Sequence, residues 1–181
     1  SASNVFAVGM GGTILRYDGA TWSRTGVGTQ FLWGVWGSSA TDVFAVGSGG
    51  TVLRWNGTQW AAQTSGTTVT LQSVWGTSPA DVFAVGSGGS VLHYDGSTWS
   101  SVASGTSNLL ARVWGASSSQ VFAVGYAGTI LRFNGTSWSP MTSGTSGWLC
   151  GVWGTSTGDV YVVGDAGTIL RFNGTSWSQM T

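Results

Sequence analysis

The sequence predicts an all-β fold, a five-bladed β-propeller of four-stranded antiparallel blades in which one blade lacks its first strand. Three observations predict it: a repeat of 38 or 39 residues, four short strand-like segments in each repeat, and a composition poor in helix formers. We expect one domain over residues 1–181. Its repeat units fall near residues 1–31, 32–70, 71–109, 110–148 and 149–181.

Three motifs recur in one register along the whole chain. The string Val-Phe-Ala-Val-Gly, or Val-Tyr-Val-Val-Gly in the last copy, begins at Val5, Val43, Val82, Val121 and Val160. An Asp-Gly or Asn-Gly dipeptide and then a Trp follow each copy, and a Val-Trp-Gly triplet precedes the last four. One small sheet cannot bury both of its faces, so such units are expected to stack around an axis, and five of them are expected to close into a ring.

Each unit contains four predicted strands, which we call A to D in chain order. Residues 71–76, 81–86 and 129–133 are examples of strands A, B and C, and strand D begins near Trp138. Their apolar residues are β-branched or aromatic, and clusters of Gly, Ser and Thr separate them, as is typical of strands. Helix is not expected, because Glu and Lys are absent while Gly and β-branched residues are abundant.

The turns are predicted from the same residues. Asp-Gly or Asn-Gly between strands C and D predicts a type I′ turn, with positive φ at both central positions. If Val46 pairs with Thr51 across the B–C hairpin, Val43 lies opposite Arg54 and Asp42 lies next to it. A repeated Arg–Asp pair between strands B and C is then expected, with His93 in place of Arg in the third unit, and a ring of anion-binding arginines is the alternative. The equivalent residues are Arg16, Arg54, His93, Arg132 and Arg171 on strand C, and Asn4, Asp42, Asp81, Gln120 and Asp159 on strand B.

Tryptophan supplies much of the expected core. Nine of the 12 Trp occupy repeat positions, and each can bury about 150–250 Å² of surface between blades. Trp55 replaces the Tyr or Phe of the other units and is also expected to pack, whereas Trp33 and Trp148 have no equivalents. The repeat positions are Trp22, Trp60, Trp99, Trp138 and Trp177 in strand D, and Trp36, Trp75, Trp114 and Trp153 in strand A.

Composition excludes several classes of function. The six basic residues are all Arg and the six acidic residues are all Asp, so the formal net charge is zero. Without Lys there is no Schiff-base or phosphate-loop lysine, and without Glu the usual glycosidase residues are missing. The single His93 and single Cys150 cannot build a two-His metal site or an internal disulfide. We therefore expect no enzymatic activity and no cofactor or metal.

The sequence says less about binding partners and cellular location than about fold. Six scattered Arg do not form the basic patch that nucleic-acid binding requires, so no nucleic-acid partner is expected. No apolar run reaches the length of a membrane span, and no signal peptide is found, so no membrane partner is expected. The localisation is not determined, although low charge and Ser/Thr/Gly richness favour a secreted or cell-surface bacterial protein.

One segment resembles a known propeller repeat. Residues 12–22, Gly-Thr-Ile-Leu-Arg-Tyr-Asp-Gly-Ala-Thr-Trp, are similar to the Asp-box (BNR-like) repeats of sialidase-type and photosystem-assembly-factor-type propellers. The resemblance extends over all five units and implies the propeller fold. The sequence departs from it because one residue between Asp and Gly is missing and three of the five acids are Asn. The Arg cluster, Tyr and Glu of sialidases have no counterparts, so no activity follows.

The strand inventory is uneven. Five B, five C and five D strands but only four A strands are predicted, which gives 19 strands and one blade without its A strand. Three explanations remain: a three-stranded blade, a strand supplied by another chain, or a cut or engineered piece of a longer array. An unpaired edge is a template for pairing, so some self-association through the open blade is expected.

Comparison between the units indicates where a ligand would bind. Positions that differ between units gather in the D–A and B–C loops, which the alternation of strand direction places at one end of the blades. Aromatic rings beside small polar groups suit sugars, so the first hypothesis is a multivalent, lectin-like binding module for carbohydrate or another small ligand. A structural or assembly module without a ligand is the alternative, an Asp-box-type glycosidase is a third, and neutral variation of the loops is the simplest explanation. The predicted ligand-binding residues are Trp33, Phe31, Trp148, Tyr126, Asp165, Arg112 and Gln72.

Overall fold

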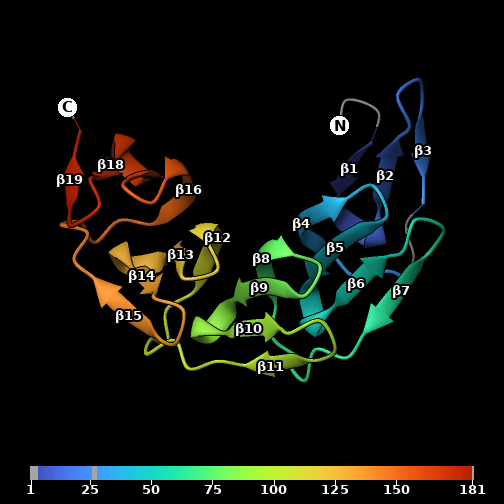
Figure 1. The fold of residues 1–181 in the computed structure, drawn as a ribbon, viewed down its shortest axis with the longest axis horizontal. Helices are drawn as coiled ribbons and strands as arrows, with labels where there is room; N and C mark the ends of the chain where they lie inside the picture. Colours follow the sequence, from blue (N-terminus) through green and yellow to red (C-terminus); the bar gives the residue numbers. More distant parts are fainter. Residues whose placement is uncertain (1–3, 26–27, 181) are drawn as a thin grey trace.

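The computed structural model describes residues 4–25 and 28–180, which form five antiparallel sheets (Figure 1). The first sheet consists of β1 (Val5–Val8), β2 (Ile14–Tyr17) and β3 (Trp22–Arg24). The second consists of β4 (Leu32–Ser39), β5 (Asp42–Gly47), β6 (Val52–Trp55) and β7 (Trp60–Gln63). The third consists of β8 (Leu71–Ser78), β9 (Asp81–Gly86), β10 (Val91–Tyr94) and β11 (Trp99–Ser101).

The last two blades repeat this plan. The fourth sheet consists of β12 (Leu110–Ser117), β13 (Gln120–Gly125), β14 (Ile130–Phe133) and β15 (Trp138–Met141). The fifth consists of β16 (Leu149–Ser156), β17 (Asp159–Gly164), β18 (Ile169–Phe172) and β19 (Trp177–Gln179). A short 3₁₀ turn joins strands B and C of every blade: η1 (Met10–Gly12), η2 (Ser48–Gly50), η3 (Ser87–Gly89), η4 (Tyr126–Gly128) and η5 (Asp165–Gly167).

Within each blade the strands pair in chain order, as the repeat predicts. The A strands β4, β8, β12 and β16 lie innermost and next to one another, and the D strands lie on the outside (Figure 1). The described chain has 19 strands, and the blade without an A strand is the first. The all-β, five-bladed propeller architecture is confirmed. The predicted outer ends of the first and last units include residues 1–3 and 181, which lie outside the described residues.

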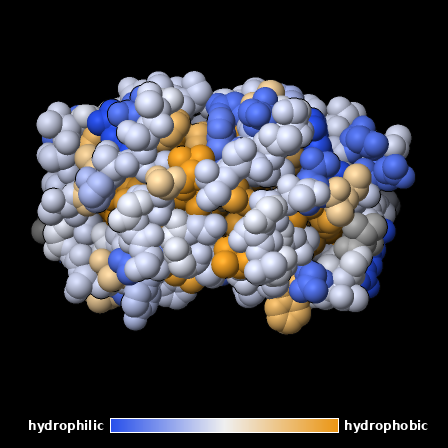
Figure 2. Space-filling model, turned by 90° about the horizontal axis from the view of Figure 1, so that it is seen from below, coloured by the Kyte–Doolittle hydropathy of each residue, from blue (hydrophilic) through white to orange (hydrophobic). Residues whose placement is uncertain are grey.

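Aromatic side chains fill the space between successive blades. Phe83 projects from one sheet toward the next, where its ring centroid lies 5.2 Å from that of Phe133 and 5.8 Å from that of Trp138. Phe44 and Phe122 make the corresponding contacts in the neighbouring seams. Four apolar clusters join the five blades in this way. Figure 2 shows apolar residues gathered in seams between columns of more polar ones.

The blades form an open arc, whereas a closed ring was expected (Figure 1). None of the four clusters joins the fifth blade to the first, and the apolar residues of the two end faces remain exposed. Trp22 is 51% exposed and Trp153 61% exposed, although their equivalents in the other blades pack. With this stacking the five blades do not complete a turn (Figure 1). The other seven repeat-position Trp and Trp55 are buried or half-buried, as predicted.

The B–C hairpin has a different register from the predicted one. Val46 pairs with Val52, Val43 with Trp55 and Phe44 with Arg54. The reason is the 3₁₀ turn, whose residues Gly49 and Gly50 adopt positive φ and lengthen the connection by one position. The expected Arg–Asp pair forms in the second and fifth blades despite the shift, because a guanidinium is long enough to reach along the strand.

The C–D turn is not type I′. Gly57 has a φ of 98°, but Asn56 does not adopt positive φ. Instead, the Asn56 Oδ1 atom accepts hydrogen bonds from the backbone N–H groups of Thr58 and Gln59 at 3.0 and 2.9 Å. The Asn56 side chain thus stabilises the turn through hydrogen bonds, and only Gly57 adopts a left-handed backbone conformation.

Candidate functional site

The D–A and B–C loops meet at one end of the blades, which we call the loop face. Backbone hydrogen bonds tie the two loops together: the Ser48 N–H donates to the Phe31 carbonyl at 2.8 Å, and the Asp165 N–H donates to the Trp148 carbonyl at 2.9 Å. A similar bond joins Tyr126 to Leu109 at 2.9 Å. The predicted shared end is therefore correct, and the loops rest on a fixed backbone.

A β-bulge explains why one position varies between units. The ladder between strands A and B shifts between Leu32 and Gly34, and again at the same place in each of the other three complete blades. The residue inside the shift is left out of the pairing, so its side chain is free to differ. These residues are Trp33, Gln72, Ala111 and Cys150.

On the second blade the structure brings two predicted residues together. The rings of Phe31 and Trp33 meet edge to face, with centroids 6.2 Å apart at an angle of 75°. The indole N–H of Trp33 donates to the Ser48 hydroxyl at 3.1 Å, which fixes the ring over η2. Both rings are nearly half exposed, so apolar ring edges and the Ser48 hydroxyl lie side by side on the surface.

A second pair lies on the fifth blade. The backbone N–H of Trp148 donates to a carboxylate oxygen of Asp165 at 3.4 Å, and both side chains are exposed. The other predicted residues lie apart from these pairs. Tyr126 is 61% exposed on η4, the Arg112 guanidinium donates to the Ala111 carbonyl at 2.8 Å, and Gln72 is half-buried in β8. The seven residues thus share one end of the fold but do not converge on one pocket.

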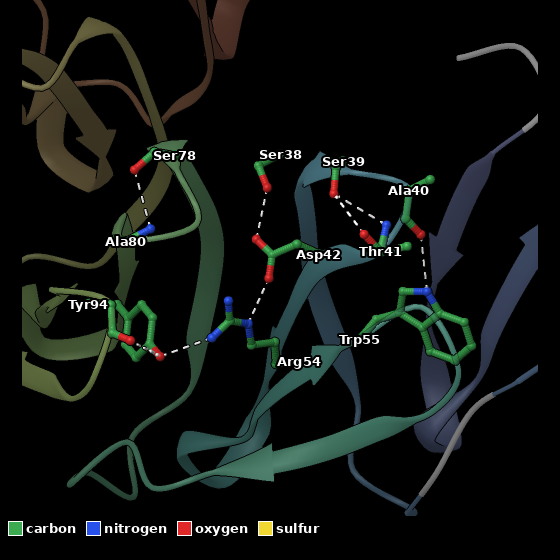
Figure 3. A network of polar contacts seen from close by, with 11 residues as sticks. Ser38, Ser39, Ala40, Thr41, Asp42, Arg54, Trp55, Ser78, Ala80 and Tyr94 are labelled. Carbon is green, nitrogen blue, oxygen red and sulfur yellow. Dashed lines mark hydrogen bonds and ion pairs between the residues drawn. The ribbon is translucent and has the colours of Figure 1, made fainter.

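A polar network joins the second and third blades at the opposite end (Figure 3). The Arg54 Nε donates to Asp42 at 2.7 Å, and Arg54 Nη1 donates to the Tyr94 hydroxyl at 3.0 Å. Ser38 donates to the other Asp42 oxygen at 2.8 Å. Sequence reasoning found the Arg–Asp pair but missed Tyr94, which comes from the next unit. Because these groups satisfy one another, the network has a structural role.

The other units keep this arrangement with changes. His93 lies 2.7 Å from Asp81, and Arg171 lies 2.9 Å from Asp159. Hydrogen bonds from the Thr155 hydroxyl and from Arg171 lower the pKa of Asp159, and that carboxylate raises the pKa of Arg171. In the fourth unit Gln120 bonds to the Thr157 carbonyl instead, and the buried Nε of Arg132 finds no acceptor among the described residues.

Residues 4–25 and 28–180 contain no cluster of three His, Cys, Asp or Glu side chains that could hold a metal ion. In the same residues no helix has the length and hydropathy needed to cross a membrane. The exposed acids Asp18 and Asp95 accept hydrogen bonds from turn backbone, so they act as turn residues.

Comparisons with known proteins agree with the architecture. No family model and no curated protein matches the sequence. Among solved structures, the chain is similar to YCF48 bound to a D1 peptide, with 15% identity, a TM-score of 0.74, and coverage of 98% of this chain and 64% of that chain. YCF48 from Cyanidioschyzon merolae is 16% identical, with a TM-score of 0.74 over 99% of this chain and 70% of that one.

The WD40 β-propeller domain of Doa1 is 14% identical, with a TM-score of 0.81 over 99% of this chain and 64% of that one. The chain thus spans slightly less than two thirds of the Doa1 and peptide-bound YCF48 chains. Such low identity shows the fold alone. The chain is a β-propeller repeat protein.

Proposed function

We propose that the chain is a non-enzymatic binding module whose loop face recognises a polypeptide partner. The observation that carries the proposal is the set of aromatic side chains, 43–61% exposed, held on hydrogen-bonded loops of three different blades. Exposed aromatic residues on a rigid surface are typical anchors of protein interfaces. Those residues are Phe31, Trp33, Tyr126 and Trp148.

The spread of these residues favours an extended partner. They lie on separate blades, so a small ligand at one of them would not reach the others, whereas a polypeptide can contact several. The composition supports binding without catalysis, because Lys and Glu are absent. One similar propeller, YCF48, has a D1 peptide bound in its structure, which supports the class of partner by analogy.

Carbohydrate is the second candidate ligand. It is favoured by the edge-to-face pair of Phe31 and Trp33 with the Ser48 hydroxyl beside it, since a sugar ring stacks on an aromatic face and bonds to adjacent polar groups. Two such aromatic sites, one on the second and one on the fifth blade, would bind a branched or repeated glycan with avidity.

One experiment separates the two ligands. The labelled full chain is applied to a peptide array and to a glycan array, together with Trp33→Ala and Tyr126→Ala variants. Trp153→Ala is the matched control, because this Trp is 61% exposed on an end face of the arc. We expect peptide binding that both loop-face variants weaken and the control retains. Glycan binding competed by free sugar would replace the first candidate by the second, and equal loss in the control would refute a loop-face site.

A further inference from the structure

The edge of β1 differs from the equivalent edge in every other blade. Strands β5, β9, β13 and β17 each pair with an A strand on the inner side, whereas β1 pairs with β2 alone among the described residues. On the side of β1 that faces the second blade, Phe6 is only half-buried, although its equivalents Phe44, Phe83 and Phe122 are buried. An unpaired strand edge presents backbone N–H and C=O groups that another strand can bind.

A cavity of about 530 Å³ lies beside this edge. Asn4, Val5 and Phe6 line it from the first blade, and the segment 35–40 together with Val43 lines it from the second. Its volume is within the range of about 300–1,000 Å³ that is common for ligand pockets. None of these lining residues is charged, so the cavity suits an uncharged occupant.

The three other seams show what occupies the same place. There the Trp of one A strand lies over a glycine of the next A strand. A Cβ built on Gly76 would lie 2.9 Å from Cη2 of Trp36, one on Gly115 would lie 2.5 Å from Trp75, and one on Gly154 would lie 2.7 Å from Trp114. Those three glycines are buried under the indole rings.

Gly37 is the fourth member of this series. It lines the cavity, it is exposed, and no Trp side chain is among the atoms closest to its Cβ position. The cavity therefore lies where the A strand of a complete blade would lie, and Gly37 lines it as the equivalent glycines line the Trp sites of the other seams. The structure itself thus specifies the sequence pattern of the occupant.

We propose that the β1 edge and this cavity bind an extended, uncharged segment of pattern Leu-x-x-Val-Trp-Gly, supplied by another polypeptide, as an added innermost strand. The backbone of the segment pairs antiparallel with β1, as β8 pairs with β9, and its Trp covers Gly37. The site lies at the A–B turn end of the blades and is distinct from the loop face, so it does not depend on the function proposed above.

The test uses a labelled synthetic peptide with the sequence of residues 70–79, Thr-Leu-Gln-Ser-Val-Trp-Gly-Thr-Ser-Pro. Fluorescence anisotropy during titration with the full chain should show saturable binding. The same peptide with the Trp75→Ala change should bind at least about tenfold more weakly, because the indole provides most of the apolar surface to be buried.

Variants of the chain locate the site. Gly37→Glu places a side chain where the incoming Trp would lie, because the Cβ positions of its equivalents point at the covering indole, and it should abolish binding. Val163→Glu should not, since Val163 is 45% exposed on the end face of the fifth blade. Far-UV circular dichroism confirms that each variant is folded.

Three results would overturn the proposal. The first is no binding by the folded chain, and the second is equal binding of the Trp75→Ala peptide. The third is a concentration-dependent oligomer, detected by sedimentation, that the peptide does not dissociate, because a second copy of the chain would then cover the β1 edge.

Discussion

Two identical segments of the chain allow a direct measurement of what packing between blades contributes. Residues 127–139 and 166–178 have the same sequence, and they place Ile130 in β14 and Ile169 in β18 at equivalent positions. Ile130 is 1% exposed in the seam between the fourth and fifth blades. Ile169 is 43% exposed on an end face of the arc. Local propensity and turn chemistry are therefore the same, and only the neighbouring blade differs.

Truncation to Ala should consequently cost much more at Ile130. Removal of three carbon atoms from a fully buried site loses about 2.4 kcal/mol at about 0.8 kcal/mol per carbon, and the cavity that remains raises the loss toward the range of about 2–5 kcal/mol. At Ile169 the transfer contribution is reduced by the exposed fraction to roughly 1–1.5 kcal/mol, and no closed cavity forms. We expect the two losses to differ by about 1–3 kcal/mol.

Equilibrium unfolding in urea, followed by tryptophan fluorescence, measures both values. The midpoint should fall more for Ile130→Ala than for Ile169→Ala, with unchanged slopes so that the midpoints report stability. The protein concentration is kept low and equal, so that any association of end faces does not contribute. Equal losses in the two variants would refute the reasoning, because they would mean that the end face of the fifth blade is as well covered as an internal seam.

Other contacts give further predictions. Arg54→Ala should lower the free energy of unfolding by about 1–3 kcal/mol, because it removes a charge-assisted hydrogen bond to the buried Asp42 carboxylate. Arg171→Ala should lower the free energy of unfolding less, because Arg171 and Asp159 are more exposed. Unfolding of both variants in urea measures the two losses. Gln120→Asp should raise the melting temperature by giving the buried Arg132 Nε an acceptor, and a lower melting temperature would contradict it. Hydrogen bonds from Thr98 and Ser97 lower the pKa of Asp95 below its ordinary value of 3.8. The Asp95 carboxylate therefore stabilises the fold fully above pH 3.8, and this stabilisation is lost as the pH falls below that value. Asp95→Asn should weaken the loss of stability in acid, and an unchanged dependence on pH below 3.8 would contradict this.

Local patterns in the sequence were sufficient for the elements and their pairing order. The Val-Phe-Ala-Val-Gly string marks a strand that is buried on both faces, and the Asn-Gly or Asp-Gly turn forces its neighbours into hairpins. The count of four A motifs, against five each of the B, C and D motifs, predicted the 19 strands and the blade that lacks its A strand. The same reasoning placed Phe31, Trp33, Trp148 and Asp165 at one end, because strand direction must alternate in a meander.

The sequence alone determined the repeat, the all-β class and most of the tryptophans that pack between blades, since these follow from short-range periodicity and residue type. Tertiary structure alone decided the open arc, because the arrangement of the blades depends on contacts across each seam, such as those of Phe83 with Phe133 and Trp138. It also decided that Tyr94 completes the Arg54 network and that Gly37 of β4 lines a cavity beside the unpaired edge of β1. These features arise from contacts between units, and no pattern within one unit encodes the distance or the angle to the next.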